Sequence, residues 1–261
     1  MAFLISRRWL IFAVVVAALA YFAWWLGEWQ FHRLEDRRER NAIIERNEAT
    51  APVDVSEVLA VDQPPAPDEE WRRVSATGTY VPEDTVIVRY RTRDGAAGVN
   101  VVVPFEVSSG ASLLVDRGWY ATSNRGATSV DVPDPPAGEV TIEAWVRRDG
   151  TGAATNVNDQ STRAISSTAI GAALDREVYG GFVELVSEDP APTEPLVSGE
   201  LPELNDGPHF FYGLQWWFFG ALAVFGLGYL VWDEARGGRR GPQDPKAAAT
   251  ARKRRIWASR S

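Results

Sequence analysis

Two long apolar segments near opposite ends of this chain constrain its fold more than any other feature. The first runs from about Trp9 to Leu26 and the second from about Phe210 to Val231. At about 1.5 Å per residue, a helix of either length crosses a hydrocarbon layer roughly 30 Å thick. The sequence therefore predicts two transmembrane helices. The predicted divisions are an N-terminal segment 1–8, a first transmembrane helix 9–27, a β-rich domain 28–208, a second transmembrane helix 209–231 and a basic tail 232–261.

Charge predicts the orientation of these helices, because Lys and Arg near membrane spans concentrate on the cytoplasmic side. Arg7 and Arg8 precede the first span, and residues 233–261 carry nine basic against three acidic residues. Residues 28–208 carry 16 basic against 32 acidic residues. Four arginines just beyond the first span oppose this trend, but the basic tail outweighs them. We expect a multi-pass protein with both termini cytoplasmic and the acidic domain outside.

The N-terminus also allows a second interpretation, a cleaved signal peptide. Ser6-Arg7-Arg8 resembles a twin-arginine start, and Ala18-Leu19-Ala20 could serve as a cleavage site. However, the apolar run continues through Trp24 and Trp25, and such an aromatic belt is typical of the membrane interface. A permanent anchor is therefore the expected arrangement.

Composition excludes several classes of function. The chain has no cysteine and two histidines, which argues against disulfides, iron–sulfur clusters, thiol chemistry and a structural zinc site. No nucleophile elbow, P-loop or dinucleotide fingerprint is present, so an enzyme is not expected. The basic tail follows a membrane span, which favours contact with membrane lipid over nucleic acid. Almost all basic residues are Arg and alanine is abundant, which is typical of a GC-rich bacterial genome and favours a bacterial cell membrane.

Between the two spans, short β-branched and aromatic runs alternate with turns, which is typical of β-strands. We expect strands at 71–81, 84–93, 99–107, 112–120, 139–147 and 181–187, a helix continuing the first span over 28–48, and a serine-capped helix at 166–176. Short strand spacing with little helix favours an antiparallel barrel or sandwich. The predicted fold class is an α+β membrane protein, in which two transmembrane helices flank a mainly antiparallel β extracytoplasmic domain with one or two short helices.

A polar and aromatic stripe follows the first span. On a helix that turns by about 100° per residue, Trp29, Gln30, Arg33 and Arg37 fall within about 60° of Leu26. Two guanidinium groups one turn apart suit paired carboxylates or phosphates. The alternative is an ordinary interfacial helix whose arginines extend toward lipid headgroups.

The second span opens with a histidine. Asp206 is expected to cap this helix. His209, Tyr212 and Trp216 then share one face with small residues that admit a partner helix or a flat ring. An ionisable side chain at the membrane edge is costly and is usually functional, and a neutral imidazole there can ligate haem iron. The alternative is an interfacial histidine bonded to headgroups or to the external domain.

Four motifs, in order, resemble a known family. They are Leu26-Gly27 with Trp29-Gln30 and Arg33, followed by Arg37 in place of the family's lysine; Gly98 through Val103-Pro104-Phe105; Arg117-Gly118-Trp119; and His209, Tyr212, Gln215, Trp216 and Trp217. Together they are similar to the Surfeit locus protein 1 family, the assembly factors of haem-copper cytochrome c oxidase.

The resemblance implies a role in maturing oxidase subunit I. Bacterial family members bind haem a through a histidine at the start of the second helix, and the matching residue here is His209. The implied cofactor is therefore haem a, with Tyr212 and Trp216 flanking the macrocycle and with Arg33 and Arg37 pairing its propionates. A different class of function remains open, that of a permanent accessory subunit of the oxidase or of a respiratory supercomplex, without any cofactor.

Overall fold

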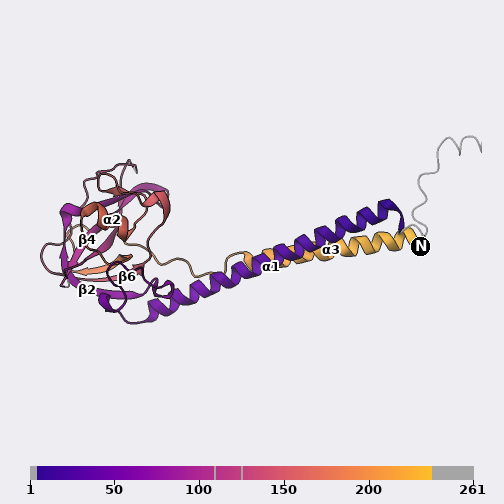
Figure 1. Cartoon of the computed structure of the whole chain (residues 1–261), viewed down its shortest axis with the longest axis horizontal. Coiled ribbons are helices and arrows are strands. Elements are labelled where there is room, and N and C mark those ends of the chain that lie inside the picture. Colours follow the sequence, from indigo (N-terminus) through magenta and orange to yellow (C-terminus); the bar gives the residue numbers. More distant parts are fainter. Residues whose placement is uncertain (1–4, 109, 125, 237–261) are drawn as a thin grey trace, which may run out of the picture. The chain divides into compact units, whose positions relative to one another are not determined.

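Two long helices carry the apolar segments of the chain in the computed structural model, which describes residues 5–108, 110–124 and 126–236. Helix α1 (Arg7–Ala49) has 43 residues and helix α3 (His209–Ala235) has 27. The apolar parts of the two helices lie side by side (Figure 1). Because α1 contains one glycine and no proline, nothing interrupts it after the first span. The prediction that residues 28–48 continue the first helix is confirmed.

The chain divides into two compact units. The first, the helix-pair unit, comprises the residues up to Arg38 and from Asp206 onward, and the second, the β unit, comprises Glu39–Asn205. The division falls within α1, so the last turns of this helix belong to the β unit. Asn47 fastens those turns, because its buried amide donates to two backbone carbonyl oxygens of the β unit at 2.7 and 2.8 Å.

Glycines bring α1 and α3 into close contact. A Cβ atom on Gly27 would lie 2.2 Å from the Trp217 ring, and one on Gly213 would lie 2.9 Å from the Phe31 ring. Gly220 packs against α1 in the same way, with its hypothetical Cβ 3.4 Å from a backbone carbonyl oxygen. The Phe31 and Trp217 rings are in contact, with their centroids 4.9 Å apart and their planes inclined by 52°. Aromatic rings of the opposite helix therefore occupy the space beside Gly27 and Gly213, whereas Gly220 lets the two backbones approach closely, as small residues commonly do in membranes.

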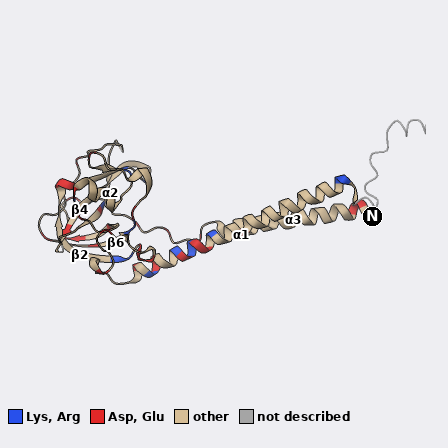
Figure 2. Ribbon diagram, viewed as in Figure 1, with Lys and Arg blue, Asp and Glu red and all other residues tan. Residues whose placement is uncertain are grey.

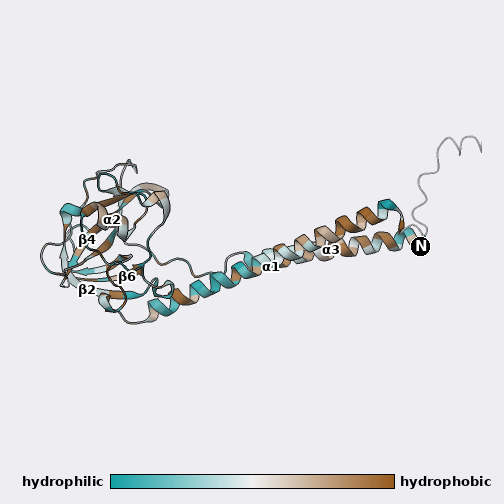
Figure 3. Cartoon of the chain, viewed as in Figure 1, coloured by the Kyte–Doolittle hydropathy of each residue, from teal (hydrophilic) through white to brown (hydrophobic). Residues whose placement is uncertain are grey.

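The outer surface of the helix pair is strongly apolar (Figure 3). Phe211 is 74% exposed and Phe225 71%, although both are large hydrophobic residues. Residues 9–27 and 207–232 contain no charged side chain, and Figure 2 shows charges beyond these stretches. Both helices are long and apolar enough to cross a membrane.

The predicted strands are present in the β unit, with small shifts at their ends. The described strands are β1 (Val53–Asp54), β2 (Arg73–Tyr80), β3 (Val86–Arg93), β4 (Ala96–Val107), β5 (Ser112–Ala121), β6 (Val140–Arg147), β7 (Ser161–Thr162) and β8 (Phe182–Asp189). Helix α2 (Ser167–Leu174) is capped by Ser166, whose hydroxyl accepts from the Ala169 amide, as predicted. The two-residue strands β1 and β7 are too short for a sequence pattern to reveal. Short 3-10 turns occupy Val55–Glu57, Pro67–Glu69, Pro82–Asp84 and Gly152–Thr155.

The sheet closes on itself as a barrel rather than forming a sandwich. The ring runs β2–β6–β8–β5–β4 and returns to β2. Its pairs are antiparallel except β5–β8, which is parallel. Strand β8 follows β6 after a connection that carries β7 and α2. It lies between β6 and β5, antiparallel to β6 and parallel to β5, and the sequence did not predict this parallel pair. The β unit is therefore a mainly antiparallel, barrel-like domain.

Successive residues of the barrel strands serve two separate cores, because side chains alternate between the faces of a strand. Leu113, Phe105 and Ile142 are fully buried in the larger cluster. Leu114 points the other way, into a second cluster that includes Ile170 of α2. Two buried faces explain the continuous apolar runs in β4 and β5.

Candidate functional site

The start of α3 is held by an ion pair rather than by a capping side chain. Pro208 occupies the N-cap position without a side-chain capping bond. The Asp206 carboxylate instead accepts from Arg38 of α1, at 2.6 Å from Nη2 and 3.1 Å from Nε. The prediction that Asp206 caps this helix is therefore wrong, because a charge-assisted bond to a guanidinium competes with backbone capping. The hydrogen bond from Arg38 lowers the pKa of Asp206.

The first residue of α3, His209, is bonded to α1. Its Nδ1 lies 2.8 Å from Oε1 of Gln30. A side-chain carbonyl oxygen can only accept, so Nδ1 donates this hydrogen bond. In a neutral ring with this bond, Nε2 keeps its lone pair. Histidines that ligate metals commonly donate their other ring N–H to a carbonyl or carboxylate in this way. The bond to Gln30 thus orients the half-buried imidazole so that a neutral ring could ligate a metal through Nε2.

Arg37 lies beside this imidazole. Gly207, with φ +64°, separates them, and a Cβ atom on this glycine would lie 3.4 Å from Cδ2 of His209 and 3.6 Å from Nε of Arg37. The left-handed backbone favours glycine here, and the lack of a side chain lets the guanidinium and the ring approach each other. The Arg37 guanidinium and the His209 imidazole therefore flank Gly207 within the helix-pair unit.

The other predicted site residues lie on the surface of the same unit. The guanidinium carbon of Arg33 lies 5.8 Å from the ring centroid of Trp29, on the exposed side of α1. Tyr212 is 48% exposed, and Trp216 is half-buried with an edge contact to another aromatic ring of α3. The structure therefore bonds Gln30 to the histidine and places Arg37 across Gly207 from it. Among the described residues, no hydrogen bond or ring contact joins Arg33, Tyr212 or Trp216 to the imidazole.

An apolar groove of about 520 Å³ lies further along the helix pair. It is lined by Ala20, Trp24, Trp217, Gly220, Ala221, Val224 and Phe225. The sequence did not indicate Trp217 as a site residue. The predicted site followed the face of the second helix that contains His209, and Trp217 lies off that face. The spacing of Gly27 and Gly213 was the available signal, since such glycines require large partners on the opposite helix.

The Arg117-Gly118-Trp119 motif has a structural role in the β unit. Arg117 is buried, with its Nη2 3.4 Å from Oε1 of Glu188, and Tyr80 donates to the same carboxylate at 2.8 Å. Gly118 has φ +131° and its hypothetical Cβ would lie 2.6 Å from the Val197 carbonyl oxygen. Within the part of the chain that the structure describes, no group of three or more His, Asp or Glu residues could hold a metal ion.

Comparison with known proteins gives a consistent family assignment. The model of the SURF1 family matches residues 17–221. An uncharacterised SURF1-like protein of Mycobacterium tuberculosis is 34% identical over 246 residues, which cover 92% of this chain and 89% of the relative. The cytochrome oxidase assembly protein SHY1 of Saccharomyces cerevisiae is 27% identical over 105 residues, 40% of this chain and 26% of the yeast protein. A SURF1-like protein of Rickettsia bellii is 25% identical over 113 residues, 42% of this chain and 44% of the relative.

The family match begins within α1 and ends within α3, so it includes the barrel and part of each helix, and it confirms the resemblance found in the sequence motifs. The chain belongs to the SURF1 family.

Proposed function

We propose that this chain is a membrane-anchored assembly factor for haem-copper cytochrome c oxidase, and that it holds haem a through His209 for delivery to subunit I. Membership of the SURF1 family supports the general assembly role, as does the yeast relative named as a cytochrome oxidase assembly protein. The bond between His209 and Gln30 is the single observation that carries the proposal of a haem ligand.

The proposed topology has both helices crossing the bacterial cell membrane and both termini in the cytoplasm. The uncharged, outwardly apolar surface of the helix pair supports insertion. The basic residues at the chain ends support this orientation. In this arrangement His209 sits near the outer end of α3, where a cofactor could enter from the membrane or leave it.

The donor set fits a haem group. His209 presents Nε2 as a neutral ligand, and the Gln30 carbonyl holds Nδ1–H and so fixes the direction of the ring. Bound haem would supply an iron centre with an open coordination site. A single histidine ligand on the rim of a helix pair holds such a group less firmly than two ligands in a closed core, which suits a carrier that must release its cargo.

Neighbouring side chains match the remaining chemistry of haem a. Arg37, beside the imidazole, and Arg33, one turn earlier, can pair with propionate carboxylates. Tyr212, which is exposed, and Trp216, which is half-buried, can cover the macrocycle. The apolar groove along the helix pair, with two tryptophans in its wall, can take the isoprenoid tail.

Absorption spectroscopy of the purified protein tests this proposal. The wild-type chain, made in cells that synthesise haem a and purified in detergent, should carry haem absorbance, and the His209→Ala variant should lose at least about nine-tenths of it. His32→Ala is the matched control, because His32 is exposed on α1 and should leave occupancy unchanged. Equal occupancy in wild type and His209→Ala would refute the ligand assignment. A chain that binds no haem and stays stoichiometric with finished oxidase would instead be an accessory subunit.

A further inference from the structure

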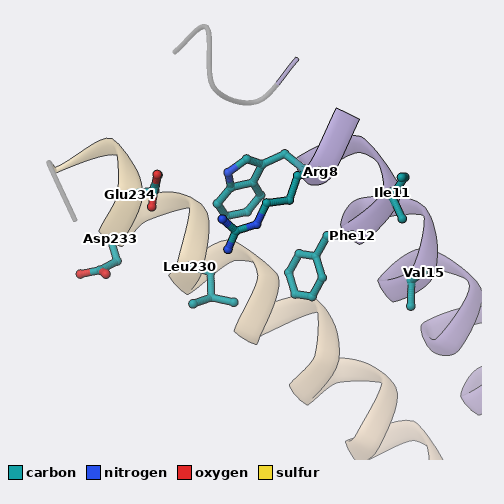
Figure 4. A pocket seen from close by; sticks show the side chains of 8 residues that line it. Arg8, Ile11, Phe12, Val15, Leu230, Asp233 and Glu234 are labelled. Carbon is teal, nitrogen blue, oxygen red and sulfur yellow. The ribbon is translucent and has the colours of Figure 1, made fainter. Parts of the chain in front are cut away.

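A second cavity lies at the opposite end of the helix pair from His209, between the start of α1 and the end of α3. It has a volume of about 550 Å³, within the range of ligand sites. Its floor is apolar, with Phe12 and Val15 from α1 and Leu230 from α3 (Figure 4). Nothing in the proposed haem site uses this cavity.

Charges of both signs line this cavity from facing helices. Arg8 extends from α1 toward α3, whereas Asp233 and Glu234 belong to α3 (Figure 4). Among the residues that the structure describes, no ion pair joins Arg8 to either carboxylate. Opposite charges that border one cavity without meeting leave room for a ligand that carries both an anion and a cation.

The two carboxylates stand where their own helix disfavours them. They lie in the last turn of α3, which contains no basic residue. The C-terminal end of a helix carries a partial negative charge, so acidic side chains there are destabilising unless a cation is present. Arg236 follows at the C-cap, but its guanidinium lies over the Trp232 ring, 4.1 Å from the centroid, and among the described residues no ion pair joins it to Asp233 or Glu234.

We propose that this cavity binds an aminophospholipid. The Arg8 guanidinium pairs with the lipid phosphate, Asp233 and Glu234 accept hydrogen bonds from its primary ammonium group, and an acyl chain lies along Phe12 and Leu230. The inference rests on the proposed insertion of the helix pair in a membrane, and it is independent of the haem proposal.

The chemistry of the headgroup distinguishes this ligand from other membrane lipids. A primary ammonium donates three hydrogen bonds to carboxylates, whereas the quaternary ammonium of phosphatidylcholine donates none. Phosphatidylglycerol carries the phosphate without any cation, so it would place a net negative charge beside two carboxylates. The site should therefore prefer phosphatidylethanolamine over both.

Native mass spectrometry of the full chain tests the proposal. The detergent-purified, delipidated protein is mixed with phosphatidylethanolamine, phosphatidylcholine and phosphatidylglycerol of identical acyl composition. We expect about tenfold stronger retention of phosphatidylethanolamine than of phosphatidylcholine, the ratio that corresponds to about 1.4 kcal/mol. The Asp233→Asn/Glu234→Gln variant should lose this preference, and Arg8→Gln should weaken retention of all three lipids.

The Glu45→Gln/Glu48→Gln variant is the charge-matched control, because it removes two exposed carboxylates from α1 far along the chain from the cavity. It should keep the wild-type preference. Equal retention of the three lipids by the wild type, a preference for phosphatidylglycerol, or an unchanged preference in the Asp233→Asn/Glu234→Gln variant would overturn the proposal. Extraction of the wild-type chain from membranes by alkaline carbonate would instead refute membrane insertion itself, so the two failures are distinguishable.

Discussion

At the scale of single residues, the hydrogen bond between Gln30 and His209 determines what the histidine can do. It joins two residues that are far apart in sequence, and it selects one tautomer of the imidazole. The sequence indicated both residues, each on its own helix. The sequence could not predict that Gln30 and His209 bond to each other. Helical spacing shows which residues share a face of one helix, but it does not show which faces of two helices meet.

Replacing Gln30 tests this positioning role. Gln30→Leu should lower haem affinity about tenfold, since loss of the partner of a metal-bound histidine typically costs that much or more. Gln30→Glu keeps an acceptor and should retain near wild-type occupancy. Haem titration followed by absorbance measures both affinities. Wild-type affinity in Gln30→Leu, together with loss of haem in His209→Ala, would show that the histidine binds iron without help from this amide.

Asp116 of the β unit gives a second prediction at this scale. Its side chain is buried, and burial raises its pKa to about 6, with repulsion from Glu184 as a smaller contribution. Asn100 donates to this carboxyl at 2.7 Å and lessens the shift. The unfolded aspartate ionises near its ordinary pKa, so between that pKa and about 6 the folded state binds more protons, and stability falls as pH rises.

The free energy of unfolding should therefore decrease between pH 5 and pH 7 by about 1 kcal/mol more in the wild type than in Asp116→Asn. Denaturant unfolding followed by tryptophan fluorescence at the two pH values measures this difference. An identical pH dependence in the two proteins would show that Asp116 is ionised throughout this range in the folded state.

At the scale of secondary-structure elements, α1 and α3 are held together by glycines that receive aromatic rings. A side chain at Gly27 would overlap the Trp217 ring, whereas one at Gly226 meets nothing within 4 Å. Overpacking of this kind costs about 1–3 kcal/mol when the neighbours cannot move. The same substitution should therefore disrupt the packing of the two helices at Gly27 and leave it unchanged at Gly226.

The absence of cysteine makes this prediction simple to measure. Ala23→Cys with Gly220→Cys should form a disulfide under mild oxidation, because a Cβ atom on Gly220 would lie 3.3 Å from that of Ala23. Adding Gly27→Val should reduce cross-linking several-fold, and Gly226→Val should leave it unchanged. Further addition of Trp217→Ala to the Gly27→Val protein should restore it. Equal cross-linking with either valine would mean that the rings do not determine how the helices pack.

Most elements were predictable because each has a local signature: apolar runs for the helices, β-branched alternation for the barrel strands and a serine cap for α2. The parallel β5–β8 pair and the pairing of Asp206 with Arg38 were not predictable. Both depend on which distant segments become neighbours, and a local pattern carries no information about that. The choice of barrel over sandwich was open for the same reason, since closure is decided by the β2–β4 pairing.

At the scale of the whole molecule, the account requires two membrane crossings with the β unit outside. Single cysteines in this cysteine-free chain can report the side on which each part lies. Asp94→Cys, in an exposed turn of the β unit, should react with a membrane-impermeant maleimide in cells whose outer permeability barrier has been opened. Ile5→Cys, before α1, should react only after the membrane is disrupted. The reverse pattern would show the opposite topology, with the β unit in the cytoplasm. Labelling of both cysteines before the membrane is disrupted would exclude a cytoplasmic N-terminus.

We propose that this chain supplies a haem-dependent step in oxidase assembly. The most direct test of this proposal is the haem a content of cytochrome c oxidase in membranes from cells that lack the chain, measured by difference spectroscopy and normalised to subunit I. The account predicts a loss of haem a that the wild-type chain and His32→Ala restore and that His209→Ala, present at the same level, does not. Oxidase with its full complement of haem a in cells without the chain, or full restoration by His209→Ala, would contradict the account.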